Sequence, residues 1–84
     1  MAKEKEVATV FSYFSKIGVA AIKVSGNLIV GDEIHIKGTT TDFKQKVDSM
    51  QIDNEAIEKA KKGDDVGLKV KDKVRPNDKI YKVN

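Results

Sequence analysis

A turn signal that occurs three times is the feature of this sequence that most constrains its fold. The signal is Gly or Asn, then Asp, then any residue, then Ile or Val, and it stands at 31–34, 63–66 and 77–80. Gly and Asn tolerate positive φ and an Asp side chain can bond nearby backbone amides, so each occurrence predicts a turn that starts a strand. We interpret the three as independent turns, because three short echoes do not make a solenoid.

Short strands are predicted between these turns. In 33–37, Ile34 and Ile36 alternate with Glu33, His35 and Lys37, which is typical of a strand with one buried and one solvated face. The other strands are expected at 6–15, 19–24, 43–52, 66–70 and 79–83. Six short strands separated by turns favour an all-β fold, a small closed six-stranded barrel.

The expected core is lean and built mainly from Val and Ile. Strand phase places Ile34, Ile36, Val66 and Leu68 inside the barrel. The aromatic residues Phe11, Tyr13, Phe14 and Phe43 are also interpreted as core. Within 43–52 the apolar phase slips between Val47 and Met50, which favours a β-bulge over the alternative that Met50 lies on the outer face.

One stretch has helical composition. Asp53 can cap it, acidic residues come early, lysines come late, and Gly63 stands at its end, so the sequence predicts a helical turn near 55–62. Two turns are marginal without tertiary support.

Composition excludes several classes of protein. The 84 residues contain no Cys and one His, which excludes disulfides, thiolate zinc sites and His-rich metal sites. No apolar run is long enough to cross a bilayer and no signal peptide is evident, so we expect a cytoplasmic protein. The abundance of Lys and Glu also fits a thermophilic source. We divide the chain into a polar tail at 1–5 and a single domain at 6–84.

Catalytic signatures are weak. The adjacent acids at 32–33 and 64–65 lie in turns where Asp has a structural role, and His35 is expected on a solvated face as a surface residue. No serine has a nucleophile-elbow context. The glycines at 63 and 67 lack the Lys and Ser or Thr of a phosphate loop. The sequence therefore predicts no catalytic residues, no metal and no cofactor.

Basic residues are the remaining positive signal. Sixteen Lys and Arg against thirteen Asp and Glu give a net charge of +3, which permits a nucleic-acid partner without requiring one. The candidate RNA-binding residues are the cations that alternate with apolar positions and one aromatic residue expected to be exposed: Lys37, Lys44, Lys46, Lys69, Lys71 and Tyr81. The alternative is that these lysines serve solubility and block edge-to-edge pairing of strands.

The order of these segments resembles the second domain of translational GTPases, with elongation factor Tu as the nearest type. The motifs lie at 10–12, 18–26, 28–36, 47–52, 60–68 and 74–80. The resemblance implies a closed six-stranded barrel of the reductase, isomerase and elongation factor kind. The GTP-binding motifs are absent, so neither GTP binding nor hydrolysis is expected. Asn77 stands where that family usually has Gly, a substitution that a turn tolerates. The same barrel also occurs at the C-terminus of collagenase-like peptidases as an accessory module.

Two functions follow from this interpretation. The first is a non-catalytic barrel that binds RNA or a component of the translation apparatus. The alternative is a protein-interaction module, accessory to a separately encoded enzyme. Fold similarity alone does not decide between them.

Overall fold

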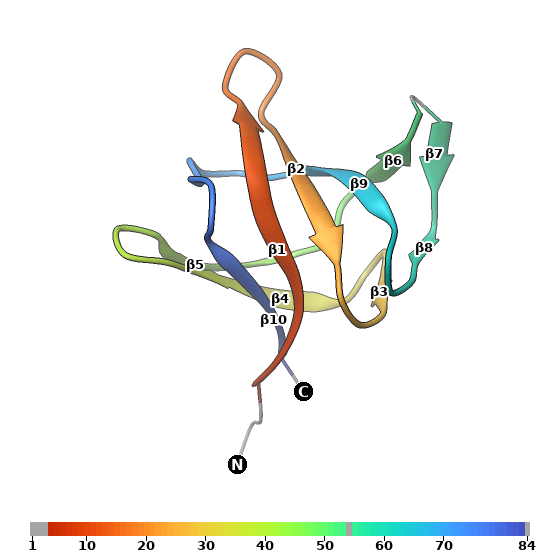
Figure 1. Cartoon of the computed structure of the whole chain (residues 1–84), viewed down its shortest axis with the longest axis horizontal. Coiled ribbons are helices and arrows are strands. Elements are labelled where there is room, and N and C mark those ends of the chain that lie inside the picture. The colour runs from red at the N-terminus through yellow and green to blue at the C-terminus, as the bar shows by residue number, and fades with distance from the viewer. Residues whose placement is uncertain (1–3, 54, 84) are drawn as a thin grey trace.

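The computed structural model describes residues 4–53 and 55–83, and all regular structure in them is β (Figure 1). The strands are β1 (Glu4–Phe14), β2 (Val19–Val24), β3 (Leu28–Ile29), β4 (Glu33–Lys37), β5 (Asp42–Lys46), β6 (Met50–Ile52), β7 (Glu55–Ile57), β8 (Lys59–Ala60), β9 (Asp65–Lys69) and β10 (Lys79–Val83). The all-β prediction is confirmed.

Eight of these strands form one antiparallel sheet in the order β5-β4-β10-β1-β2-β9-β6-β7, and β3 pairs with β8 separately. The sheet curls around the core, but within the described residues its hydrogen-bonded ladder does not close on itself, since β5 and β7 are its two ends (Figure 1). The prediction of a closed six-stranded barrel is therefore wrong in both strand number and closure.

The concave face of the sheet holds the core. Ile34, Ile36 and Leu68 are fully buried and Val66 is 2% exposed, as the alternation predicted. The rest of the cluster is also mainly aliphatic: Val7, Ala8, Val10, Ala20, Ile22, Val24, Leu28, Val47, Met50, Ala60, Val70, Val74 and Ile80. Val47 and Met50 are both buried because β5 and β6 are separate strands joined by a short connection, so the bulge expected between them is not needed.

The helical turn predicted near 55–62 is wrong. Residues 55–57 and 59–60 are strands β7 and β8. Asp53 adopts a φ of 52° and starts a tight turn, after which Glu55 pairs with Ile52 and Ile57 pairs with Met50. A two-turn helix is marginal by itself. The hairpin instead gives these backbone groups cross-strand partners and lets Ile57 pack on the core.

Strand β1 carries an irregularity that redirects two aromatic side chains. Its register against β2 shifts between Val10 and Ser12, so Phe11 is the extra residue. A bulge of this kind changes which side chains face outward. Val10 is buried, whereas Phe11 and Phe14 are about half exposed. The prediction that Phe11 and Phe14 belong to the core is wrong for this reason, while Tyr13 and Phe43 do pack against it.

The three predicted turns are confirmed, and they share more than their sequence. In the first, the Ile29 N–H donates to the Asp32 carboxylate and the Asp32 N–H donates to the Ile29 carbonyl. The Gly31 N–H donates to the Val47 carbonyl, and the Val47 N–H donates back to the Asp32 carbonyl. The same set of bonds joins Lys61, Gly63 and Asp64 to Val24, and Arg75, Asn77 and Asp78 to Val10.

We call these three units the turn locks. Their third residues, Gly31, Gly63 and Asn77, have φ of 100°, 94° and 77°, a conformation that Gly and Asn adopt most readily. Each lock fastens a turn to a valine that is at most 2% exposed. Buried backbone groups of the valine are thereby satisfied without a neighbouring strand.

A single side chain bridges the gap beside β5. The amide nitrogen of Gln45 donates to the Lys69 carbonyl at 3.0 Å, and its amide oxygen accepts from the Lys71 N–H at 2.9 Å. Gln45 is 9% exposed. Its side chain thus supplies two bonds between β5, at the end of the sheet, and the backbone at the end of β9 and just after it.

Candidate interaction surfaces

The convex face over β4 and β5 carries half of the predicted site residues. Lys37, Lys44 and Lys46 are exposed there, as alternation predicted. Across the β4–β5 ladder, Lys46 lies opposite Glu33 and Lys37 lies opposite Asp42. Two of the three lysines therefore have an acid as cross-strand partner, which reduces the attraction of this face for a phosphate backbone.

His35 is an integral part of this charged face. It lies opposite Lys44 on β5 and opposite Tyr81 on β10. Its ring nitrogen Nε2 forms a hydrogen bond with the Asp42 carboxylate. This bond, and then the positive charges of His35, Lys37 and Lys44, hold the pKa of Asp42 below its ordinary value. Tyr81 is half-buried, so it is less available for base stacking than the sequence predicted.

The structure brings Lys46, Lys69 and Lys71 together. They line a hollow of about 210 Å³ beside the bridging Gln45, with Asp48 also in its wall. The six predicted residues thus divide into this trio and a second group around His35. Lys46 belongs to the trio and also adjoins the second group, because it pairs with Glu33 on β4.

The convex face over β1, β2 and β9 is different in chemistry. Phe11 is 53% exposed, Phe14 51% and Ile17 65%. Phe11 and Phe14 belong to β1, and Ile17 to the turn that joins β1 to β2. Large apolar side chains gathered on a convex sheet face are the kind of patch that marks contact with another molecule.

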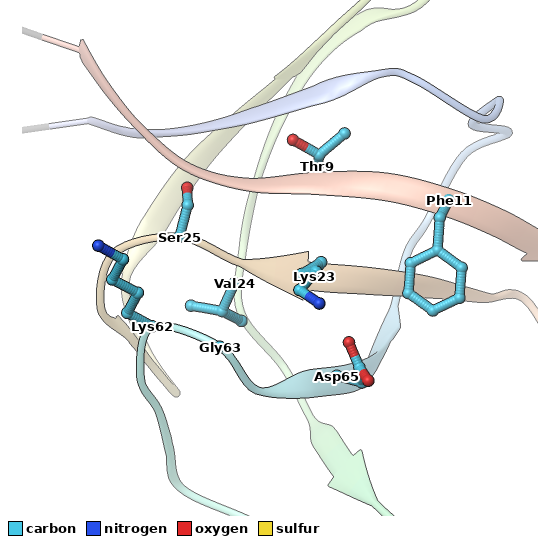
Figure 2. Close-up of a pocket in the computed structure, with 8 residues that line it drawn as sticks. All are labelled: Thr9, Phe11, Lys23, Val24, Ser25, Lys62, Gly63 and Asp65. Carbon is cyan, nitrogen blue, oxygen red and sulfur yellow. The ribbon is translucent and has the colours of Figure 1, made fainter.

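Two adjoining hollows lie along this face, and we call them together the outer trough. The first, of about 660 Å³, is lined mainly by Thr9, Phe11, Lys23, Ser25, Lys62 and Asp65. Figure 2 shows the Phe11 ring projecting from β1 across β2 toward Asp65 on β9. The second, of about 430 Å³, is lined mainly by Phe14, Ile17, Val19, Ala21, Asp53 and Gly67. Phe11 and Asp65 border both hollows.

Charge is distributed unevenly along the outer trough. Lys23 and Lys62 line the first hollow together with Asp65. The charged residues of the second hollow are Asp53 and Asp65. Lys23 and Asp65 are cross-strand partners in the β2–β9 ladder, so Lys62 and Asp53 are the charges left toward the two ends. The trough therefore has a basic end and an acidic end.

Sequence reasoning missed this surface. An apolar residue in a strand is assigned to the core unless a break in phase is recognised, and the register shift at Phe11 leaves no mark in residue type. The available signal was that 11–14 contains Phe11, Tyr13 and Phe14, which a simple alternation cannot place on one face. At least one of them had to point outward.

Among residues 4–53 and 55–83, no group of three or more His, Asp or Glu side chains is arranged to hold a metal ion. No helix in the same part of the chain is long and apolar enough to span a membrane.

The chain is similar to part of several peptidases. It is 47% identical over 72 residues to two collagenases of Porphyromonas gingivalis, one of them from strain ATCC BAA-308 / W83; this match covers 83% of the chain but only 20% and 17% of those proteins. It is 40% identical over 77 residues to an uncharacterised protease of Methanocaldococcus jannaschii, covering 90% of the chain and 19% of that protein. The chain thus spans about a fifth of the length of these relatives. No family model matches it.

Solved structures with a similar fold also come from a peptidase. Two crystal structures of the C-terminal domain of a protein described as a U32 peptidase, from Geobacillus thermoleovorans, superpose with TM-scores of 0.86 and 0.87. They cover 90% and 93% of this chain and 96% and 91% of their own, at 20% and 22% identity. At this level of identity the likeness concerns the fold.

These comparisons correct the resemblance drawn from the sequence. The relatives are collagenase and protease sequences and C-terminal peptidase domains, so the assignment to elongation factor Tu domain 2 is wrong. The description as a translation-factor-like, RNA-binding protein is therefore wrong as well. The accessory-module alternative is the one that the relatives favour.

Proposed function

We propose that this β domain is a non-catalytic accessory module of a collagenase-like or U32-type peptidase, and that it acts through contacts with protein. The observation that carries the proposal is the 47% identity to a segment that makes up only a fifth of a collagenase. A module of this kind serves either a peptidase domain in the same polypeptide or one encoded separately.

The chemistry of the surface supports a binding role. About half of the acids lie in turn locks or pair with lysines across a ladder, and His35 is engaged with Asp42. A general acid or base needs a reacting group within hydrogen-bond reach and usually a perturbed pKa. By contrast, the outer trough offers exposed apolar side chains beside a hollow, which is a feature of contact surfaces.

A chimaera tests this proposal. The matched segment of the P. gingivalis collagenase is deleted in one variant and replaced by residues 4–83 of this chain in another. We expect the deletion to lower the cleavage of denatured collagen at least tenfold, about 1.4 kcal/mol, and the replacement to restore it to within a few-fold of the parent. Both are measured with labelled gelatin.

Two controls make the result decisive. The present chain alone should leave gelatin intact, and gelatin cleavage by the chain alone would show that it is itself an enzyme. Each collagenase variant is also assayed by thermal melting, so that loss of fold is recognised. A folded chimaera with no more activity than the deletion variant would contradict the proposal.

A further inference from the structure

We propose that the outer trough binds a segment of extended polypeptide, about six residues long, with apolar side chains in its middle and opposite charges at its two ends. This inference rests on the proposed function and deepens it by naming what the accessory module holds. It goes beyond the relatives, whose similarity says nothing about which face of the domain is used.

The shape of the trough suits an extended chain. Its floor is the convex face of β2 and β9, where Ala21 lies opposite Gly67. A Cβ on Gly67 would meet the Val19 side chain at 3.3 Å, so these small residues keep the floor low between higher walls. Strand β2 has six residues, or about 20 Å at a rise of 3.3 Å per residue. A ligand strand of similar length fits along it.

The walls supply the apolar contacts. Phe11, Phe14 and Ile17 each leave half or more of their surface in solvent. A partner that covers them removes apolar surface from water, at about 25 cal/mol for each Å². Aromatic side chains of this kind contribute heavily to protein–protein contacts because they bury a large area at low entropic cost.

The charges at the two ends give the bound chain a direction. Lys62 lines the first hollow and Asp53 the second. A peptide with an acid near Lys62 and a base near Asp53 makes favourable contacts at both ends, whereas a peptide with acids at both ends meets a like charge at Asp53. Such complementarity contributes mainly to specificity.

Polypeptide fits this surface better than the other occupants. A nucleic acid would bring phosphates to Asp53 and Asp65, where the attraction needed for phosphate binding is missing. A second copy would place one concave trough against another and leave both hollows unfilled. The second hollow also lies away from the paired chain ends, since Glu4 pairs with Val83 at one end of the molecule and the β1–β2 turn lies at the other (Figure 1).

Two designed peptides test the proposal on this chain alone. Both are acetylated, amidated and fluorescein-labelled, with a middle of alternating Phe, Thr and Val; one begins with Glu and ends with Lys, and the other has Glu at both ends. We expect the peptide with opposite charges to bind at least fivefold more tightly than the peptide with two acids in fluorescence anisotropy at low salt. Absence of binding by both, or equal affinity for the two, would overturn the inference.

Matched variants place the binding site. Phe11→Ser with Phe14→Ser should lower the affinity for the preferred peptide at least tenfold. The control is Ile29→Ser with Val30→Ser, which removes two exposed apolar side chains (40% and 38% exposed) outside the trough and should leave affinity unchanged. Equal losses in the two double variants, or no loss in the first, would contradict the assignment.

Two further measurements cover the remaining outcomes. If the Phe11 and Phe14 double variant melts early, Ala21→Gln decides instead, because it fills the floor from the convex face and should also abolish binding. Sedimentation of the parent tests self-association: a dimer that the Phe11 and Phe14 change dissociates would make a second copy the occupant and overturn the proposal. Peptide binding without rescue in the chimaera would reject the proposed function alone, and rescue without peptide binding would reject this inference alone.

Discussion

The convex side of the sheet has two regions with opposite chemistry. Over β4 and β5, outward side chains are charged, and Glu33, Lys46, Lys37 and Asp42 lie in pairs of opposite sign across the ladder. Over β1, β2 and β9, outward residues include Phe11, Phe14, Ala21 and Gly67. A sheet that faces water normally alternates apolar and polar residues. The first region has the composition of a solvated surface, whereas the second has the composition of a surface that contacts another molecule.

The largest expected effect is on stability, and it differs between the buried and the exposed face of the sheet at the trough. Leu68 lies under the trough and is fully buried, so Leu68→Ala should cost about 2–5 kcal/mol. Phe14→Ala on the convex side should cost less than about 0.5 kcal/mol, because it changes an exposed position. Both are measured by urea unfolding.

The comparison between regions depends on the second value. A loss at Phe14 as large as that at Leu68 would mean that the exposed aromatic residues are an extension of the core, and the trough would then be no free surface.

An intermediate effect on stability is expected at Gln45 and not at Gln51. Gln45→Ala removes the bridge beside β5 and leaves the Lys71 N–H and the Lys69 carbonyl without this partner. We expect a loss of about 1–3 kcal/mol in unfolding free energy. Gln51→Ala is the control, because Gln51 is exposed at the trough, and it should change stability by less than about 0.5 kcal/mol. Equal values for the two variants would show that the bridge does not hold the open side of the sheet.

The smallest expected effect lies in the charged region and depends on pH. The pKa of Asp42 is lowered in the folded protein, first by its hydrogen bond with His35. The contribution of ionised Asp42 to stability is therefore present above the pKa of about 3.9 in the unfolded chain. It is lost as the pH falls through the lower pKa of the folded protein. Thermal melts of parent and Asp42→Asn should differ slightly at pH 6 and converge toward pH 3. A difference that grows as the solution is acidified would contradict this sign.

The sequence made the turns and the core predictable, because both depend on local rules. Asp next to Gly or Asn marks the turn locks, and strict alternation places Ile34 and Leu68 inside. The trough was only partly predictable. Alternation shows that Phe11, Tyr13 and Phe14 cannot share one face, but which of them point outward depends on the register shift at Phe11, which pairing with β2 determines. The open sheet was missed for a similar reason: Gln45 reads as any polar strand residue, and only the three-dimensional structure shows its two bonds.

The family assignment failed for a reason that the turn locks make clear. The motifs that suggested a translation factor are mostly the Gly-Asp and Asn-Asp turns themselves. Such turns answer a backbone requirement, positive φ followed by a bonded Asp, which any small sheet with the same corners will impose. They therefore carry information about the path of the chain and little about its function.

The turn locks also have a consequence for the order in which this chain can fold. They join Gly31 to Val47, Gly63 to Val24, and Asn77 to Val10, so the three loops that they close are nested, each enclosing the one before. The entropy lost on closing a loop rises with its length. Once the innermost loop is closed, only the segments on its two sides remain free between the residues that the next lock joins. The loop that the outermost lock closes is shortened in the same way. A sheet whose neighbouring central strands β1 and β10 come from opposite ends of the chain can thus assemble from the middle of the sequence outward, as a series of short closures in place of one long search.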